Sequence, residues 1–241
     1  KGLRELDRTS KLLCSASKLA LDDSHITVTP ENTDEFGVVT ATTLSSLWNI
    51  AEFDRGGIQD GPLFSDVSLF PGTVVNAASS QVSIRHNIQG FNTTVSTGYT
   101  ASIDALRYAC DFLRLQRAQT VLLGATESIS LAHFIGFYNL GFLAGITGPE
   151  VSCPFDKRSN GIILGEGACV LILEKESNAK ARKAKIYLTI DGTGSYFEAY
   201  KLGKYHPQAE GIRLAMKQAL KNSNKSPKEI SYISASANSV L

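Results

Sequence analysis

The sequence predicts an α/β protein in which helices cover both faces of a β-sheet. Two observations carry this prediction. Short apolar runs such as Val121–Leu123 and Ala168–Leu173 have the length of strands and no polar alternation, as expected for strands buried on both faces. Segments with apolar residues at helical spacing, such as Ser102–Leu115, lie between these runs, and this succession is typical of α/β folds.

Each element follows from its own pattern. In the first helix, Leu12, Leu13 and Ala16 recur at helical spacing, and Asp22-Asp23-Ser24 ends it. The predicted elements, in chain order, are Ser10–Leu21 (helix), Phe36–Thr40 (strand), Ser45–Phe53 (helix), Ser102–Leu115 (helix), Val121–Leu123 (strand), Ala168–Leu173 (strand) and Glu210–Leu220 (helix).

The composition is that of one large globular domain. Of the 241 residues, 43% are apolar and 20% charged, enough for a substantial core. The formal charge of +1 comes from 24 basic and 23 acidic residues spread along the chain, so we expect neither nucleic acid nor a membrane surface as a partner. No apolar stretch is long enough to span a bilayer and the N-terminus lacks the apolar core of a signal peptide, so we expect a cytoplasmic protein.

The cysteines and histidines form no metal or redox pattern. We expect reduced, buried thiols at Cys14, Cys110, Cys153 and Cys169. We expect surface or helix-capping positions for His25, His86, His133 and His206. No metal and no bound cofactor are therefore predicted.

Several short motifs follow one another in a fixed order. They are Phe70-Pro-Gly-Thr-Val-Val-Asn76, Thr94-Val-Ser-Thr-Gly-Tyr-Thr-Ala-Ser-Ile-Asp-Ala-Leu106, Val121-Leu-Leu-Gly-Ala-Thr-Glu127, Pro154-Phe-Asp-Lys-Arg-Ser-Asn-Gly161 and Leu164-Gly-Glu-Gly-Ala168. A small-residue turn before a helix means little alone, but the ordered set is specific. From about Leu6 to Asn238 the chain resembles the β-ketoacyl-acyl carrier protein synthase family.

This resemblance implies the thiolase-like fold, a five-layered α-β-α-β-α sandwich of two related halves. The chain is expected to cover mainly the N-terminal half, with the second half starting at about residue 186. Ile186–Gly192 and Glu229–Ala235 are expected as its first strands. The chain starts at Lys1 without a methionine, which leaves two alternatives: a naturally shortened member or part of a longer polypeptide.

The resemblance also shows what the catalytic positions lack. In the family, the turn before the helix carries a cysteine, and a helix N-terminus lowers the pKa of such a thiol. Here the position holds Tyr99, and a phenol has an ordinary pKa of about 10 against roughly 8.5 for a thiol. Where the family has a histidine within Ile-Asn-Ala-His-Gly-Thr, this chain has Ser236. We therefore predict no catalytic residue in this chain.

Loss of both groups resembles the chain length factor of type II polyketide synthases. That resemblance implies a heterodimer with an active ketosynthase, and an acyl carrier protein whose phosphopantetheine bears the growing chain. The substrate tunnel is predicted at Leu44, Leu47, Ala51, Tyr99 and Phe137. Leu44, Leu47 and Ala51 have the i, i+3, i+7 spacing of one helix face, although ordinary core packing explains that spacing equally well. Tyr99 is expected to plug the pocket with its ring.

Two other functions stay open. One is a residual malonyl-carrier-protein decarboxylase or acyltransferase that uses Thr97, Thr100 or Tyr99 with backbone amides as an oxyanion hole; a threonine hydroxyl would need an adjacent base. The other is a fragment of a structural scaffold.

Four further groups of residues are assigned structural roles. The aromatic residues Phe134, Phe137, Tyr138 and Phe142 are expected mainly in core packing. Gly165 and Gly167 are expected to allow close backbone approach or unusual dihedral angles. Asp156 and Arg158 are expected to join adjacent loops. Phe70, Pro71 and Asn76 are expected in a loop that faces the partner.

Overall fold

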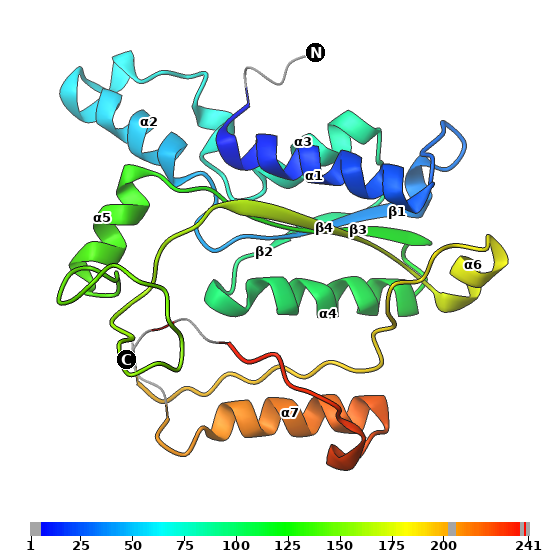
Figure 1. The fold of residues 1–241 in the computed structure, drawn as a ribbon. Helices are drawn as coiled ribbons and strands as arrows, with labels where there is room; N and C mark the ends of the chain where they lie inside the picture. The colour runs from blue at the N-terminus through cyan, green and yellow to red at the C-terminus, as the bar shows by residue number, and fades with distance from the viewer. Residues whose placement is uncertain (1–5, 202–205, 237–238, 240–241) are drawn as a thin grey trace. The chain divides into compact units, whose positions relative to one another are not determined.

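The computed structural model describes residues 6–201, 206–236 and 239, and the chain forms two compact units. Residues 1–184 and 237–241 belong to the first unit and residues 185–236 to the second. The helices and strands (Figure 1) are α1 (Arg8–Ser24), β1 (Phe36–Ala41), α2 (Leu47–Gln59), α3 (Ala77–His86), β2 (Asn92–Val95), α4 (Ala101–Arg114), β3 (Thr120–Glu127), α5 (Leu131–Asn139), β4 (Gly167–Glu174), α6 (Glu176–Ala181) and α7 (Glu210–Ser223).

The sheet of the first unit has the strand order β2-β1-β3-β4. β1 is parallel to both of its neighbours, and Val39 lies opposite Thr93 on β2 and Leu123 on β3. β4 runs antiparallel to β3, so that Gly167 pairs with Glu127. The carboxyl ends of β1, β2 and β3 and the first residue of β4 therefore meet at one edge of the sheet.

Helices cover both faces of this sheet, as predicted. α1 and α3 lie on one face and α4 on the other (Figure 1). Successive residues of a strand point to opposite faces, and Val38 belongs to the core beneath α1 whereas Val39 belongs to the core beneath α4. Leu13 and Leu122 are fully buried in the first of these cores.

β4 departs from the prediction of a strand buried on both faces. Its first six residues alternate between exposed and half-buried, and Leu173 and Glu174 are half-buried. Val170 and Ile172 pack against the core beneath α1, while Cys169 and Leu171 are exposed on the other face. The reason is the position of β4 at the end of the sheet, since α4 packs mainly against β1, β2 and β3.

The predicted helices and strands of the first unit are present, but the start of α2 was predicted wrongly. The helix begins at Leu47 instead of Ser45 and continues to Gln59. Ser45 has a positive φ of 56°, which helical residues do not adopt. Leu44 therefore precedes the helix and does not share a helix face with Leu47 and Ala51.

The second unit consists of α7 and the chain around it. No strand forms at 186–192 or 229–235, contrary to the prediction. A strand needs a hydrogen-bonded neighbour, and the chain near Gly194 lies against α7 instead. Ser195 N donates to Gln218 Oε1 at 3.1 Å, and Asn222 Nδ2 donates to the carbonyl of Thr193 at 2.8 Å.

Candidate functional site

A hollow opens at the edge of the sheet where the strand ends meet. In parallel sheets this edge is where ligands usually bind. The larger cavity, of about 450 Å³, is lined by the ends of β1 and β3, the start of α4 and the first residues of β4. A smaller one, of about 170 Å³, adjoins it because both are lined by Thr43, Tyr99 and Glu127. The smaller cavity is also lined by Leu44, Ser128, Ile129, His133, Phe137, Ile162, Leu164 and Gly165.

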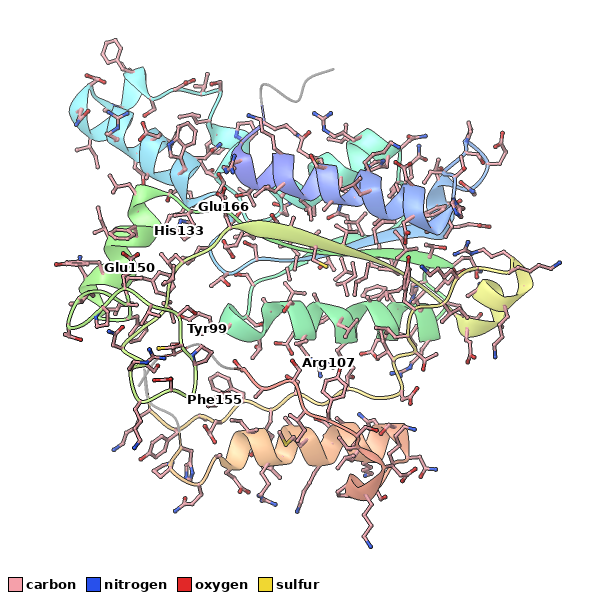
Figure 2. All side chains as sticks on the ribbon, in the orientation of Figure 1. Tyr99, Arg107, His133, Glu150, Phe155 and Glu166 are labelled. Carbon is pink, nitrogen blue, oxygen red and sulfur yellow. The ribbon has the colours of Figure 1, made fainter. Side chains whose placement is uncertain are left out.

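Tyr99 stands on the tight turn that leads into α4 (Figure 2). Gly98 has a φ of +70°, a left-handed conformation that glycine adopts without strain. Tyr99 follows on a 3-10 turn, borders both cavities, and its side chain is 68% exposed. The structure therefore places the residue at the helix N-terminus, as the motif predicts.

Asp104 ties this turn to the first turns of α4. Its carboxylate is buried and accepts hydrogen bonds from Thr97 Oγ1 at 2.7 Å and from Thr100 Oγ1 at 2.9 Å. Asp104 lies four residues after Thr100, yet it was not predicted as a partner of these hydroxyls. Because an aspartate carboxylate is only a weak base, its evident role here is to hold the turn.

Glu127, the last residue of β3, anchors the chain that leaves β1. Its carboxylate accepts a hydrogen bond from the backbone N–H of Thr43 at 2.7 Å and from that of Leu44 at 3.3 Å. The hydroxyl of Thr42 donates to both carboxylate oxygens at 3.2 and 3.3 Å. One charged side chain thus fixes the backbone of the segment that carries Leu44 into the smaller cavity.

His133 lies on α5 (Figure 2), and its ring is close to the carboxylate of Glu127. Its side chain is only 5% exposed, and its Nε2 is 3.8 Å from Glu127 Oε1. Nδ1 is 2.9 Å from the Oγ of Ser130, which also caps the helix by accepting the backbone N–H of His133. Burial lowers the pKa of His133, and the Glu127 carboxylate opposes that shift more weakly. The expected surface or capping position for this histidine was wrong.

Glu166 joins three chain segments next to the smaller cavity. It accepts a hydrogen bond from Arg8 Nε at 2.7 Å and from the backbone N–H of Ile129 at 3.3 Å. The bond from Arg8 lowers the pKa of Glu166. This contact explains the glutamate of the Leu-Gly-Glu-Gly-Ala motif, because it joins the chain before β4 to α1 and to the end of β3.

The predicted tunnel residues are brought together only in part. Leu44, Tyr99 and Phe137 line the smaller cavity, whereas Leu47 and Ala51 line neither cavity. Tyr99 lines both cavities but is 68% exposed, in contrast to the expectation that its ring fills the pocket. Ser236 is exposed and belongs to the second unit.

α5 contradicts the expectation of core packing for its aromatic residues. Phe134 and Tyr138 are 48% and 53% exposed, and their rings stack at 6.4 Å between centroids. The helix packs mainly against α2, and neither core cluster includes an α5 residue, so its aromatic side chains lie outside the core. Phe137 is half-buried, and its ring lies 6.5 Å from that of Phe142.

Two other structural roles were also predicted wrongly. Neither Gly165 nor Gly167 has a positive φ, and a Cβ at either position would meet nothing within 4 Å. Each borders a cavity, so the missing side chain leaves space there. Arg158 bonds Asp156 within one turn, at 2.9 and 3.0 Å, instead of joining separate loops. This ion pair lowers the pKa of Asp156.

The predictions for the cysteines were confirmed only in part, and that for His25 was confirmed. Cys14 and Cys110 are buried, and burial raises the pKa of each thiol, but Cys153 is half-buried and Cys169 is exposed in the larger cavity. His25 caps the end of α1 as expected. Phe70 is exposed and its ring lies 5.7 Å from that of Phe53; Pro71 follows it on the same 3-10 turn, and Asn76 immediately precedes α3.

Neither a metal cluster nor a membrane span is found in the described part of the chain. Across 6–201, 206–236 and 239, no group of three histidine, cysteine, aspartate or glutamate side chains is placed to hold a metal ion. Over the same ranges, no helix combines the length and apolar character needed to cross a bilayer.

The sequence matches two family profiles. The profile described as "Beta-ketoacyl synthase, N-terminal domain" matches residues 1–179, and the one described as "Beta-ketoacyl synthase, C-terminal domain" matches residues 187–241. The 3-oxoacyl-[acyl-carrier-protein] synthase 2 of Coxiella burnetii is 28% identical over 239 residues, and that of Rhizobium meliloti is 30% identical over 248 residues. These alignments cover 98% and 100% of this chain but 58% of each relative.

Solved structures of ketosynthases share the fold of this chain. A β-ketoacyl synthase from Burkholderia phymatum has a TM-score of 0.88 at 24% identity, over 99% of this chain and 59% of that one. The type II polyketide synthase complex AntDE:AntF, an acyl carrier protein with its ketosynthase bound to the hexaketide, has a TM-score of 0.88 at 26% identity, over 99% and 60%. The ishigamide ketosynthase/chain length factor has a TM-score of 0.86 at 25% identity, over 98% and 59%. These likenesses confirm the predicted fold class.

Proposed function

Because the chain belongs to the β-ketoacyl synthase family, we propose that it is a catalytically inactive member, a chain length factor that pairs with an active ketosynthase and shapes the tunnel for the growing polyketide. The partner would supply the reactive cysteine. An acyl carrier protein would deliver the chain on its phosphopantetheine arm. The likeness to the ishigamide ketosynthase/chain length factor and to the AntDE:AntF complex supports this proposal.

The observation that carries the proposal is Tyr99 at the start of α4. The turn, the helix N-terminus and the cavity are all present, but the side chain at this point is a phenol, a group that ionises far less readily than a thiol. The hydroxyls of Thr97 and Thr100 are bonded to Asp104. A site with this geometry and no activated nucleophile suits the binding of an acyl chain better than its transfer.

Two further observations fit a tunnel and a partner surface. The smaller cavity has apolar walls, formed largely by Leu44, Ile129 and Phe137, as an acyl chain requires. The outer face of α5 exposes Phe134 and Tyr138, and exposed clusters of large apolar residues often mark protein interfaces. In this proposal α5 lies near the partner, and the chain enters the cavity beside it.

The primary test is co-expression with a candidate ketosynthase from the same gene neighbourhood. A tag on one subunit is used for purification, and light scattering gives the mass of the product. We expect a one-to-one complex. A stable homodimer that does not bind the ketosynthase would refute the proposal.

A second experiment tests the tunnel within that complex. Leu44→Trp should shorten the main product, because the larger side chain would fill part of the smaller cavity. Leu19→Trp is the matched control, since Leu19 lies on α1 and is 69% exposed. Unchanged product length in the Leu44 variant would remove this cavity from the proposed tunnel.

A residual decarboxylase or acyltransferase is the second candidate, and one observation favours it. Cys169 exposes a thiol in the same cavity as Tyr99. Incubation with malonyl-carrier protein would then release acetyl-carrier protein. Under this alternative, Tyr99→Phe or Cys169→Ser should lower the rate, whereas under the main proposal the wild type itself shows no turnover above the rate without protein.

A further inference from the structure

The pattern of burial on α5 is the reverse of what its sequence favours. His133 is the buried residue of this helix, at 5% exposed, while Leu131 on the same helix is 73% exposed. Enclosing a polar ring while leucine faces solvent is unfavourable unless the ring finds hydrogen-bond partners. Nδ1 has such a partner in Ser130, whereas no described residue forms a hydrogen bond with Nε2.

The contacts of the ring favour one tautomer. Nδ1 is 2.9 Å from the Ser130 hydroxyl, a geometry in which the hydroxyl donates its proton to Nδ1 while its oxygen accepts the backbone N–H of His133. The proton of the neutral ring then lies on Nε2. The carboxylate of Glu127, 3.8 Å from Nε2, favours the same arrangement because it attracts an N–H and repels a lone pair.

Nε2 is thus a buried donor with no hydrogen-bond acceptor among the described residues. The 3.8 Å to Glu127 exceeds hydrogen-bonding distance, and that carboxylate is engaged by the backbone N–H groups of Thr43 and Leu44. A buried donor without an acceptor is costly. An acceptor supplied by a ligand would remove that cost.

The smaller cavity is where such a ligand would lie, because His133 and Glu127 both line it. His133 lines this cavity, and its Nε2 is shielded from solvent. Two wall residues, Leu44 and Phe137, belong to neither core cluster, so a shift of their side chains would leave both cores intact. The remaining walls are largely apolar and suit a hydrocarbon chain.

We infer that His133 is a specificity-determining residue that recognises a carbonyl oxygen on the acyl chain, so that the smaller cavity favours a β-ketoacyl chain over a saturated chain of equal length. The inference rests on the proposed function for its substrate class. The contact is one hydrogen bond from Nε2–H to the ketone oxygen. No covalent step is involved.

The test compares two probes, 3-oxodecanoyl-pantetheine and decanoyl-pantetheine, by calorimetric titration. The wild type should bind the oxo probe about fivefold more tightly, the effect of one hydrogen bond. His133→Leu should reduce this preference to below about twofold. His133→Gln keeps an N–H donor and should retain part of the preference.

A matched control comes from α3. His86 also has a buried Nε2 with no hydrogen-bond partner in the described part of the chain, but it lines neither cavity, so His86→Leu should keep the full preference. The ¹⁵Nε2 resonance of His133 should move with the oxo probe and not with the saturated one. If His133→Leu does not fold, this resonance and the His133→Gln variant still test the inference.

An equal preference in the wild type and in both His133 variants, or a wild type with no preference, overturns the inference. Failure of the proposed function looks different, because no complex with the ketosynthase would then form. The probes are titrated into the chain alone as well as into the complex. All residues that line the cavity belong to the first unit, so the result with the chain alone tests the inference in either case.

Discussion

Replacing Gly124 by alanine tests how closely α1 lies against β3. A Cβ at this position would be 2.6 Å from Leu13 Cδ1 and 3.5 Å from Val170 Cγ2. The first distance is well inside van der Waals contact, and Leu13 is completely buried, so its side chain cannot move without disturbing the core. Overpacking of this kind costs about 1–3 kcal/mol of the free energy of unfolding.

The double variant makes the prediction sharper. Leu13→Ala alone should cost about 2–5 kcal/mol, because it leaves a cavity. In that background the methyl group of Gly124→Ala enters the vacated space, and its distance of 3.5 Å to Val170 Cγ2 is an ordinary van der Waals contact. The two changes together should therefore cost about 1–2 kcal/mol less than the sum of the single changes.

Urea unfolding followed by circular dichroism measures all three variants. Leu19→Ala serves as the control, because Leu19 lies on the same helix but is 69% exposed and its loss should change the free energy of unfolding by less than about 0.5 kcal/mol. Strictly additive costs for Leu13 and Gly124 would refute the close contact between α1 and β3.

Three further predictions concern the site. Asp104→Ala removes the acceptor of two threonine hydroxyls and should lower the free energy of unfolding by about 1–3 kcal/mol in urea titrations; a negligible change would mean that the turn is held by other contacts. Because burial lowers the pKa of His133, the unfolded chain takes up its proton first, so the wild type should lose stability relative to His133→Gln as the pH falls below 6.5. Parallel stability profiles for the two proteins would contradict this. Cys169, exposed in the larger cavity, should react fastest with a disulfide reagent, and Cys169→Ser should remove that phase, while buried Cys14 reacts only on unfolding; persistence of the fast phase in Cys169→Ser would contradict the assignment.

The sequence predicts the first unit well because its strands and helices have strong local patterns. β1 and β3 are apolar runs that end in a buried sheet, and α4 shows clear helical spacing. The start of α2 is harder to predict, since it follows the positive φ of Ser45 and a segment that Glu127 holds in place. That contact joins residues more than 80 positions apart, and no local pattern reports it.

The site is predicted only where a motif marks it. Tyr99 is found because its turn and helix resemble a family motif, and Leu44 and Phe137 do line a cavity. His133 was assigned to a surface or capping position, and it is buried three residues after the capping Ser130 while its apolar neighbours are exposed, so no local pattern predicts its burial. The exposure of Cys169 follows from the strand order, which the sequence pattern does not contain.

The anchoring role of Glu127 constrains how this protein can diverge. The same carboxylate fixes the segment that carries Leu44 and faces the ring of His133. Any replacement of Glu127 therefore alters two walls of the smaller cavity at once. Such a replacement would rarely be retained as the first change toward binding a different ligand. Leu44 and Phe137, which lie outside both cores, can change singly with little loss of stability. We expect variation among close homologues to accumulate at those two positions while Glu127 stays unchanged.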